Sequence, residues 1–356
     1  MKKTFFYTFG ITLSLIVSLI LCEIFSRLIF GGVFRNDPVL KRNSENGLIY
    51  QANLKSRFIS FEWDVAININ SLGFRDLEKI YNNEKEKVLV LGDSCTEGFG
   101  LALDKTFPKQ LEKLLNQNNL NYNVLNAGIS GNNLVDYLEI YNRYFKDDSN
   151  IKIIIIALYV GNDLIDNYAI RKIDLIEQNN ISFIIKNFAA RHSTFYNITN
   201  RFVKSNIQLR SVLTKLGFVH VRSNILSNYD PENKLLLQKI KYSTNLIGDF
   251  KKKLNNKKLY VALIPSKEQI NDDYWKLLNQ VIDSNKKLER DFPTNTVEND
   301  LNKQKINTIN LYKTFNSKKS GKNLLYFKYD PHPNENGNNL MALEIFEKLY
   351  VDLKKN

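Results

Sequence analysis

The sequence has few cysteines and few histidines for its length. Two cysteines and three histidines occur among 356 residues. No Cys/His cluster has the spacing of a metal site, so we expect no metal ion. A bridge between Cys22 and Cys95 is implausible because Cys22 lies in an apolar N-terminal run. We expect Cys95 to pack as a small apolar residue.

The sequence also lacks an internal repeat, and its positive charges do not form a stripe. The formal net charge is +13, but the lysines are scattered through Asn- and Lys-rich stretches. A nucleic-acid-binding domain usually gathers its basic residues on one face, so we expect no nucleic-acid partner. Hydrophobic residues make up 43% of the chain, which is enough for a globular core.

Two lysines near the N-terminus are followed by an uncharged run over residues 4–22. At about 1.5 Å per residue, a helix of this length matches the hydrocarbon thickness of a bilayer. No small-x-small cleavage site follows, and bulky residues continue to Phe30, which favours an uncleaved membrane anchor over a signal peptide. Basic residues flank the run on both sides and leave its orientation open. The short preceding tail favours a bulk domain outside the cytoplasm.

The remaining pattern divides the chain into a stalk and a large α/β domain. Residues 31–83 predict a stalk or small subdomain with a short strand pair, and residues 84–356 predict the main domain. Five apolar strands alternate with helices there, which predicts a parallel sheet covered on both faces. Residues 168–230 are extra to this alternation. We expect them to form a helical insertion that would lie as a cap over the site.

Polar loops follow the predicted strands. The run "VLVLGDSCTEGFG" ends in Ser94, "NAGISGNN" contains Gly131, "GND" contains Asn162, and "DPHPNENG" contains Asp330 and His332. Because the carboxyl ends of parallel strands meet at one edge of a sheet, we expect these loops to lie together.

These residue types suit acyl transfer through a serine. The Ser94 hydroxyl needs a base, and His332 supplies one that the Asp330 carboxylate can orient. The backbone N–H groups of Ser94 and Gly131, with the side-chain amide of Asn162, would suit an oxyanion. Each residue alone also has an ordinary structural explanation, such as a helix cap or a turn.

With these blocks in this order, the sequence resembles the SGNH hydrolases, also called GDSL esterases and lipases. The resemblance implies a three-layer α/β/α sandwich around a parallel sheet, similar in outline to flavodoxin-like folds. It also implies Ser94 as nucleophile, Gly131 and Asn162 as oxyanion donors, and Asp330 with His332 as the rest of the triad. Only Pro331 separates Asp330 from His332, a spacing that resembles relatives which acetylate or deacetylate cell-surface polysaccharides.

We therefore expect a membrane-anchored serine esterase that needs no cofactor. It would hydrolyse an acyl ester of a cell-envelope glycan or lipid through an acyl-enzyme on Ser94. Two alternatives stay open: an O-acyltransferase, for example for O-acetylation of a surface polysaccharide, and a non-catalytic glycan-binding scaffold.

The predicted insertion carries a basic segment with no acidic residue between Phe183 and Asn224. It would either lie on an anionic membrane surface or form a solvated face of the cap. Its seven basic residues are Lys186, Arg191, Arg201, Lys204, Arg210, Lys215 and Arg222.

Overall fold

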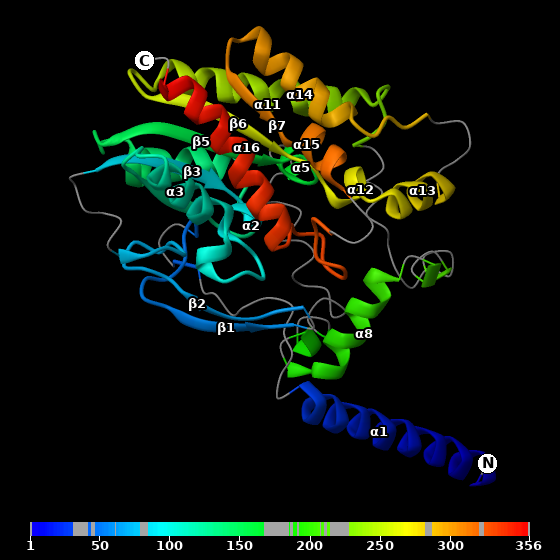
Figure 1. Ribbon diagram of the computed structural model, residues 1–356. Helices are drawn as coiled ribbons and strands as arrows, with labels where there is room; N and C mark the ends of the chain where they lie inside the picture. Colours follow the sequence, from blue (N-terminus) through cyan, green and yellow to red (C-terminus); the bar gives the residue numbers. More distant parts are fainter. Residues whose placement is uncertain are drawn as a thin grey trace.

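The computed structural model describes residues 2–30, 42–43, 47–60, 62–78, 85–166, 185, 188–190, 192–206, 208–209, 212–213, 228–281, 287–319 and 324–354. A five-stranded parallel sheet with the order β4-β3-β5-β6-β7 forms its centre (Figure 1). The strands are β3 (Glu86–Gly92), β4 (Tyr122–Gly128), β5 (Ile151–Tyr159), β6 (Lys258–Ile264) and β7 (Asn307–Asn310).

Helices cover both faces of the sheet. On one face lie α3 (Phe107–Gln117), α15 (Leu311–Lys318) and α16 (Glu335–Lys354), and on the other lie α4 (Leu134–Ile140), α11 (Lys234–Lys252) and α14 (Phe292–Lys303). The predicted three-layer α/β/α fold is therefore confirmed. The shorter helices are α2 (Ser94–Glu97), η2 (Leu103–Lys105), η3 (Tyr141–Phe145), α5 (Asp163–Asp166), α12 (Lys267–Ile270) and α13 (Asp272–Val281).

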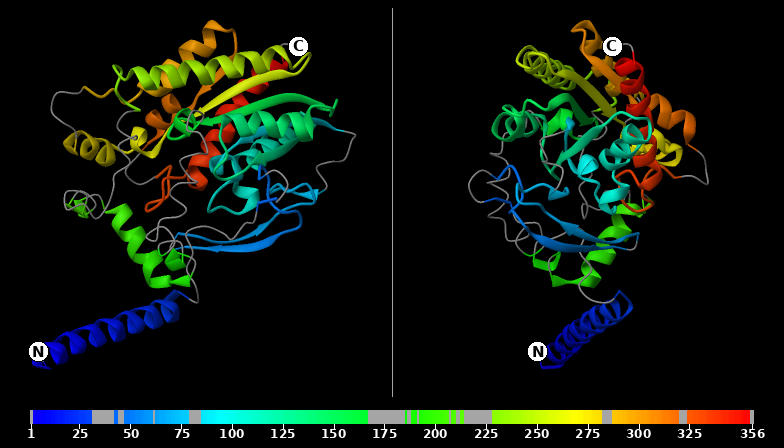
Figure 2. Two further views of the ribbon diagram at one scale, coloured as in Figure 1. Left: turned by 180° about the vertical axis from the view of Figure 1, so that it is seen from behind. Right: turned by 60° about the vertical axis from the view of Figure 1, so that its left-hand side comes forward.

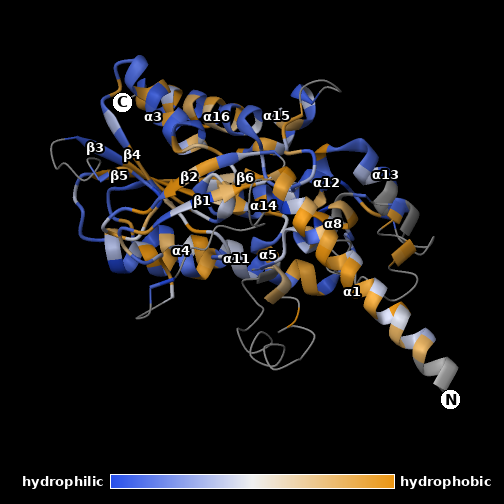
Figure 3. Ribbon diagram, turned by 90° about the horizontal axis from the view of Figure 1, so that it is seen from below, coloured by the Kyte–Doolittle hydropathy of each residue, from blue (hydrophilic) through white to orange (hydrophobic). Residues whose placement is uncertain are grey.

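Strand β5 shows why this sequence forms a doubly covered sheet. It contains four consecutive isoleucines, whose β-branched side chains suit extended backbone. Successive side chains point to opposite faces, so Ile153 and Ile155 join one hydrophobic cluster while Ile154 and Ile156 join the other. All four are fully buried. Figure 3 shows hydrophobic residues concentrated in the strands and along the N-terminal helix.

The segment before the sheet packs onto the main domain. Its antiparallel strands β1 (Lys55–Ile59) and β2 (Asp64–Asn68) form the expected strand pair. Phe58 and Trp63 are buried in the same cluster as Leu89 of β3. The ring of Phe58 also contacts Phe99 edge-on, with centroids 4.8 Å apart. The described part of residues 31–83 thus packs against the main domain beside Phe99.

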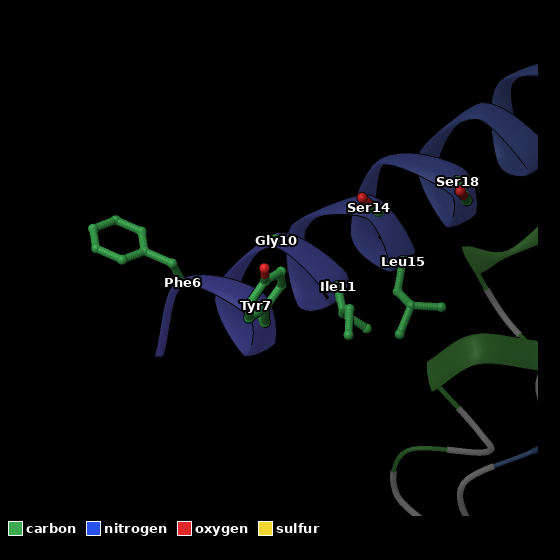
Figure 4. A pocket seen from close by; sticks show the side chains of 7 residues that line it. All are labelled: Phe6, Tyr7, Gly10, Ile11, Ser14, Leu15 and Ser18. Carbon is green, nitrogen blue, oxygen red and sulfur yellow. The ribbon is translucent and has the colours of Figure 1, made fainter. Parts of the chain in front are cut away.

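Helix α1 (Lys2–Phe30) projects from the rest of the molecule (Figure 2). Its stretch Phe6–Phe30 is long and apolar enough to cross a bilayer, as a membrane anchor or a signal sequence would be. Figure 4 shows a hollow on this helix, lined by side chains of α1 such as Tyr7, Ile11 and Leu15. The C-terminal end of α1 contacts α8 (Thr194–Ser205), a helix of the predicted insertion. Much of residues 168–230 lies outside the described residues.

Candidate active site

Ser94 stands at the turn from β3 into α2. The Asp93 carboxylate caps α2 by accepting a hydrogen bond from the Cys95 N–H at 2.8 Å. Helix α2 lies so close to β4 that a Cβ on Gly128 would come within 2.2 Å of the Glu97 nitrogen. Glycine at this position therefore lets α2, and with it Ser94, sit against the ends of the strands. Cys95 is buried as predicted, and burial raises the pKa of its thiol.

The structure brings Ser94, His332 and Asp330 into one chain of hydrogen bonds. Ser94 Oγ lies 2.7 Å from His332 Nε2, and His332 Nδ1 lies 2.5 Å from Asp330 Oδ1. The backbone N–H of His332 donates to the same carboxylate oxygen at 3.0 Å. The ring of Phe99 stacks on the imidazole at 4.2 Å. One ring nitrogen therefore faces the serine and the other faces the carboxylate, as base catalysis requires.

A buried ion pair holds the other oxygen of Asp330. Arg201 Nη2 donates to Asp330 Oδ2 at 2.9 Å, and both side chains are nearly inaccessible to solvent. Burial opposes ionisation of Asp330, but the charge and hydrogen bonds of His332 and the charge of Arg201 outweigh it and hold the pKa of Asp330 at about 2. Asp330 is therefore a carboxylate at neutral pH and can stabilise an imidazolium beside it.

The three predicted oxyanion donors lie in loops at one edge of the sheet. Ser94 follows β3, Gly131 follows β4 and Asn162 follows β5. Strand β3 lies between β4 and β5 in the sheet. Gly131 has φ +79°, a backbone conformation that favours glycine. In the described part of the chain, the N–H groups of Ser94 and Gly131 donate no hydrogen bond, and Oδ1 of Asn162 is buried without a partner. The two backbone N–H groups are thus available to a ligand.

Lys267 holds the loop that carries Asp330 and His332. Lys267 comes shortly after β6 in the sequence, and its side chain is buried. The ammonium group donates to the backbone carbonyls of Phe327 at 2.7 Å, Lys328 at 2.9 Å and Asp330 at 3.3 Å. Burial lowers the pKa of Lys267. Lys267 therefore fixes the backbone of this loop, in addition to the hydrogen bonds that the triad side chains make.

Sequence reasoning missed the roles of Lys267 and Arg201. Lys267 follows a parallel strand, and the rule that singled out Ser94 could have found it. Arg201 was assigned to a membrane-facing or solvated segment, which is wrong because its side chain is buried and pairs with Asp330. The side chains of the other six basic residues of that segment lie outside the described residues. His192 is exposed, and its ring lies 4.6 Å from the ring of Phe188.

Comparison with known proteins identifies the family. A family model described as GDSL-like lipase/acylhydrolase matches residues 88–345, which is most of the chain. The protein is therefore a carboxylic ester hydrolase. It belongs to the GDSL-like lipase/acylhydrolase family, as the resemblance to SGNH hydrolases predicted. No match was found among curated proteins.

The chain is also similar to solved structures, including the following three. An acetyl xylan esterase, AlAXEase, is 14% identical, with 74% of this chain and 99% of that chain covered and a TM-score of 0.39. A lipase/acylhydrolase from Enterococcus faecalis is 11% identical, with 74% and 95% covered and a TM-score of 0.40. A lipolytic protein of the G-D-S-L family from Veillonella parvula is 12% identical, with 74% and 97% covered and a TM-score of 0.37.

Proposed function

We propose that the protein is a serine esterase in which Ser94 is the nucleophile, His332 the general base and Asp330 the carboxylate that orients it. The observation that carries this proposal is the continuous hydrogen-bond chain from Ser94 Oγ through both nitrogens of His332 to Asp330. When the Nδ1–H of His332 donates to the Asp330 carboxylate, Nε2 is left free to accept the serine proton.

The reaction has two half-reactions on this geometry. Ser94 Oγ attacks the carbonyl carbon of the ester while His332 Nε2 takes its proton, and the oxygen of the tetrahedral intermediate is bound by the N–H donors of Ser94, Gly131 and Asn162. His332 then gives the proton to the leaving alcohol, which produces an acyl-enzyme. A water molecule, deprotonated by His332, attacks the carbonyl carbon of the acyl-enzyme. The bond from that carbon to Ser94 Oγ breaks, His332 returns the proton to Ser94 Oγ, and the acid is released.

The proposed substrate is an acyl ester of a cell-envelope glycan or lipid. Support comes from α1, whose described side chains between Phe6 and Leu21 are exposed to the surroundings of the protein, as those of a membrane helix are. We propose residues 1–30 as the anchor, residues 31–83 as a small subdomain, and residues 84–356 as the catalytic domain outside the cytoplasm. No group of three or more metal-ligating side chains is found in the described residues.

A serine-reactive fluorophosphonate tests the proposed nucleophile. We expect one labelled site on the full chain in detergent, lost in Ser94→Ala and kept in Cys95→Ala, which removes the neighbouring thiol as a matched control. Labelling that survives Ser94→Ala would show that another residue is the nucleophile.

A second experiment distinguishes a transferase from a hydrolase. A free sugar is added to the reaction, and the amount of acetylated sugar is compared with the amount of free acetate.

Protease protection tests the proposed topology. Protease added to intact cells with a permeable outer layer should digest the domain after Phe30 and leave α1 in the membrane. Full protection of the domain, or a mature N-terminus beyond Phe30, would contradict this topology.

A further inference from the structure

Helix α8 touches the triad through Arg201. The guanidinium donates to Asp330 Oδ2 and to Ser60 Oγ, and it lies over the ring of Trp63 at 4.7 Å. Its side chain is only 6% exposed. Arg201 therefore enters the site from the insertion and makes contacts there with two other parts of the chain.

The other end of α8 is held by a carboxylate of the membrane helix. Glu23 of α1 accepts hydrogen bonds from Ser193 Oγ at 2.8 Å and from the N–H groups of Thr194 and Phe195 at 3.0 Å. Arg27 pairs with Glu23 at 2.7 Å and donates to the carbonyl of His192 at 2.6 Å. A carboxylate is costly in an apolar membrane helix, and these donors at the positive end of α8 offset that cost.

We propose that α8 ties the membrane helix to the triad: Arg201 is a positioning residue that holds Asp330 for His332, and Glu23 holds α8 where Arg201 can do so. This inference rests on the proposed function of Ser94, His332 and Asp330. In Figures 1 and 2, α8 lies between α1 and the domain that carries the sheet.

The chemistry of the carboxylate explains why Arg201 matters for position. Asp330 Oδ1 serves the backbone and the ring of His332, so Oδ2 needs its own donor in this buried place. The fork of the guanidinium reaches Asp330 and Ser60 together, which a lysine ammonium does not do with the same geometry. The charged groups that face the Asp330–His332 pair are Arg201, Lys267 and Asp93. Lys267 donates to the backbone carbonyl of Asp330, and Asp93 is a buried carboxylate that interacts electrostatically with His332.

The test compares variants of the full chain in lipid nanodiscs with p-nitrophenyl acetate as substrate. In Arg201→Met we expect kcat to fall about tenfold or more with KM nearly unchanged, because the lost hydrogen bond is to a charged group and not to substrate. Removing this positive charge makes the Asp330–His332 pair easier to protonate. The acidic limb of the kcat/KM profile should therefore move to higher pH. Arg201→Lys keeps the positive charge but not the guanidinium fork. It should bring the acidic limb back towards its wild-type pH, while kcat recovers less.

Glu23→Ala tests the membrane side of the connection. We expect kcat to fall at least about threefold, and we expect no further fall when Glu23→Ala is added to Arg201→Met, because both changes act through one contact. The matched controls are Arg143→Met and Glu139→Ala, which break an exposed pair with the same helical spacing as Arg27 and Glu23. Both controls should keep wild-type kcat.

Three outcomes would overturn the inference. They are wild-type kcat and pH profile in Arg201→Met, multiplicative losses in the Glu23 and Arg201 double variant, and a loss in Arg201→Met that appears only as a lower thermal midpoint. If Arg201→Met does not fold, Arg201→Gln carries the same test, because it removes the charge and keeps a donor. Failure of the proposed function is recognised separately, since hydrolysis by wild type would then be absent or would survive Ser94→Ala.

Discussion

The carboxylate of Glu97 binds both the backbone N–H and the hydroxyl of Ser130, at 2.7 Å and 2.6 Å. The same oxygen accepts the hydroxyl hydrogen of Tyr50 at 2.7 Å. Arg42 adds a hydrogen bond to the carbonyl of Ser130. Glu97 belongs to α2, which begins at Ser94, and Ser130 precedes Gly131. This buried carboxylate therefore fixes the distance between the proposed nucleophile and one proposed oxyanion donor.

Glu97→Gln should weaken both the fold and the reaction. Gln keeps the size of Glu97 but replaces the carboxylate that accepts hydrogen bonds from Tyr50 and from two groups of Ser130 with an uncharged amide. We expect the free energy of unfolding to fall by about 1–3 kcal/mol. We also expect a lower kcat because the Gly131 loop loses its fixed position. Urea unfolding and ester hydrolysis measure the two effects, with the exposed Glu139→Gln as control. Wild-type kcat in Glu97→Gln would mean that other contacts position the loop.

The triad residues should act as one unit. Ser94→Ala and His332→Ala should each abolish turnover, and the double variant should lose little more, because members of a triad are strongly non-additive. Asp330→Asn should be less damaging but should still cost on the order of a hundredfold in kcat. Steady-state kinetics measure these losses. An Asp330→Asn enzyme with wild-type turnover would show that His332 is oriented by another group.

The ion pairs of Asp330 should make stability depend on acid pH. The folded pKa is about 2 against an ordinary value of 3.8, so the unfolded chain binds the proton first as the pH falls. The contribution is complete above about pH 5 and is lost as the pH falls towards 2, and its size is on the order of 2 kcal/mol. Chemical unfolding between pH 5 and pH 2.5 should show a shallower decline for Asp330→Asn than for wild type. The exposed Asp147→Asn should leave the wild-type decline unchanged.

Two glycines should fail in different ways when replaced by alanine. Gly128→Ala places its Cβ against the backbone of Glu97 and should lower the free energy of unfolding by about 3 kcal/mol. At Gly131 the nearest atom is Arg42 Nη2 at 3.8 Å, so a Cβ has room there. Its positive φ costs an alanine only about 1–2 kcal/mol.

Gly131→Ala should therefore keep most of its stability while kcat falls about tenfold or more, because the N–H of this residue is re-aimed. Thermal unfolding and kcat, measured together, separate the two effects. Equal losses of stability in the two variants would contradict this difference.

The sheet and the clustering of the site were predictable because strong local signals specify them. Buried strands such as Ile151–Tyr159 are continuous apolar runs, and the rule that polar loops follow parallel strands places Ser94 near His332. Both signals lie within a few residues of sequence.

Contacts between distant segments were not predictable in the same way. Arg201 and Glu23 are charged residues on helical segments, and helical periodicity does not state which buried partner a charge will meet. The strand pair with Phe58 and Trp63 was predicted, but its pattern does not reveal that these side chains join the core beside Phe99. In both cases the information lies in three-dimensional packing and not in a local pattern.

The short connection after α1 sets the working distance of the proposed enzyme. Arg42, which binds Ser130 beside the site, follows Phe30 by only twelve positions (30 to 42). Such a length of chain spans at most about 40 Å. With α1 in a bilayer, the triad is confined to a thin layer above the lipid surface. For an ester held in the same membrane, turnover would then depend on how many ester groups occupy each unit of membrane area, and dilution of the surrounding medium would not change it.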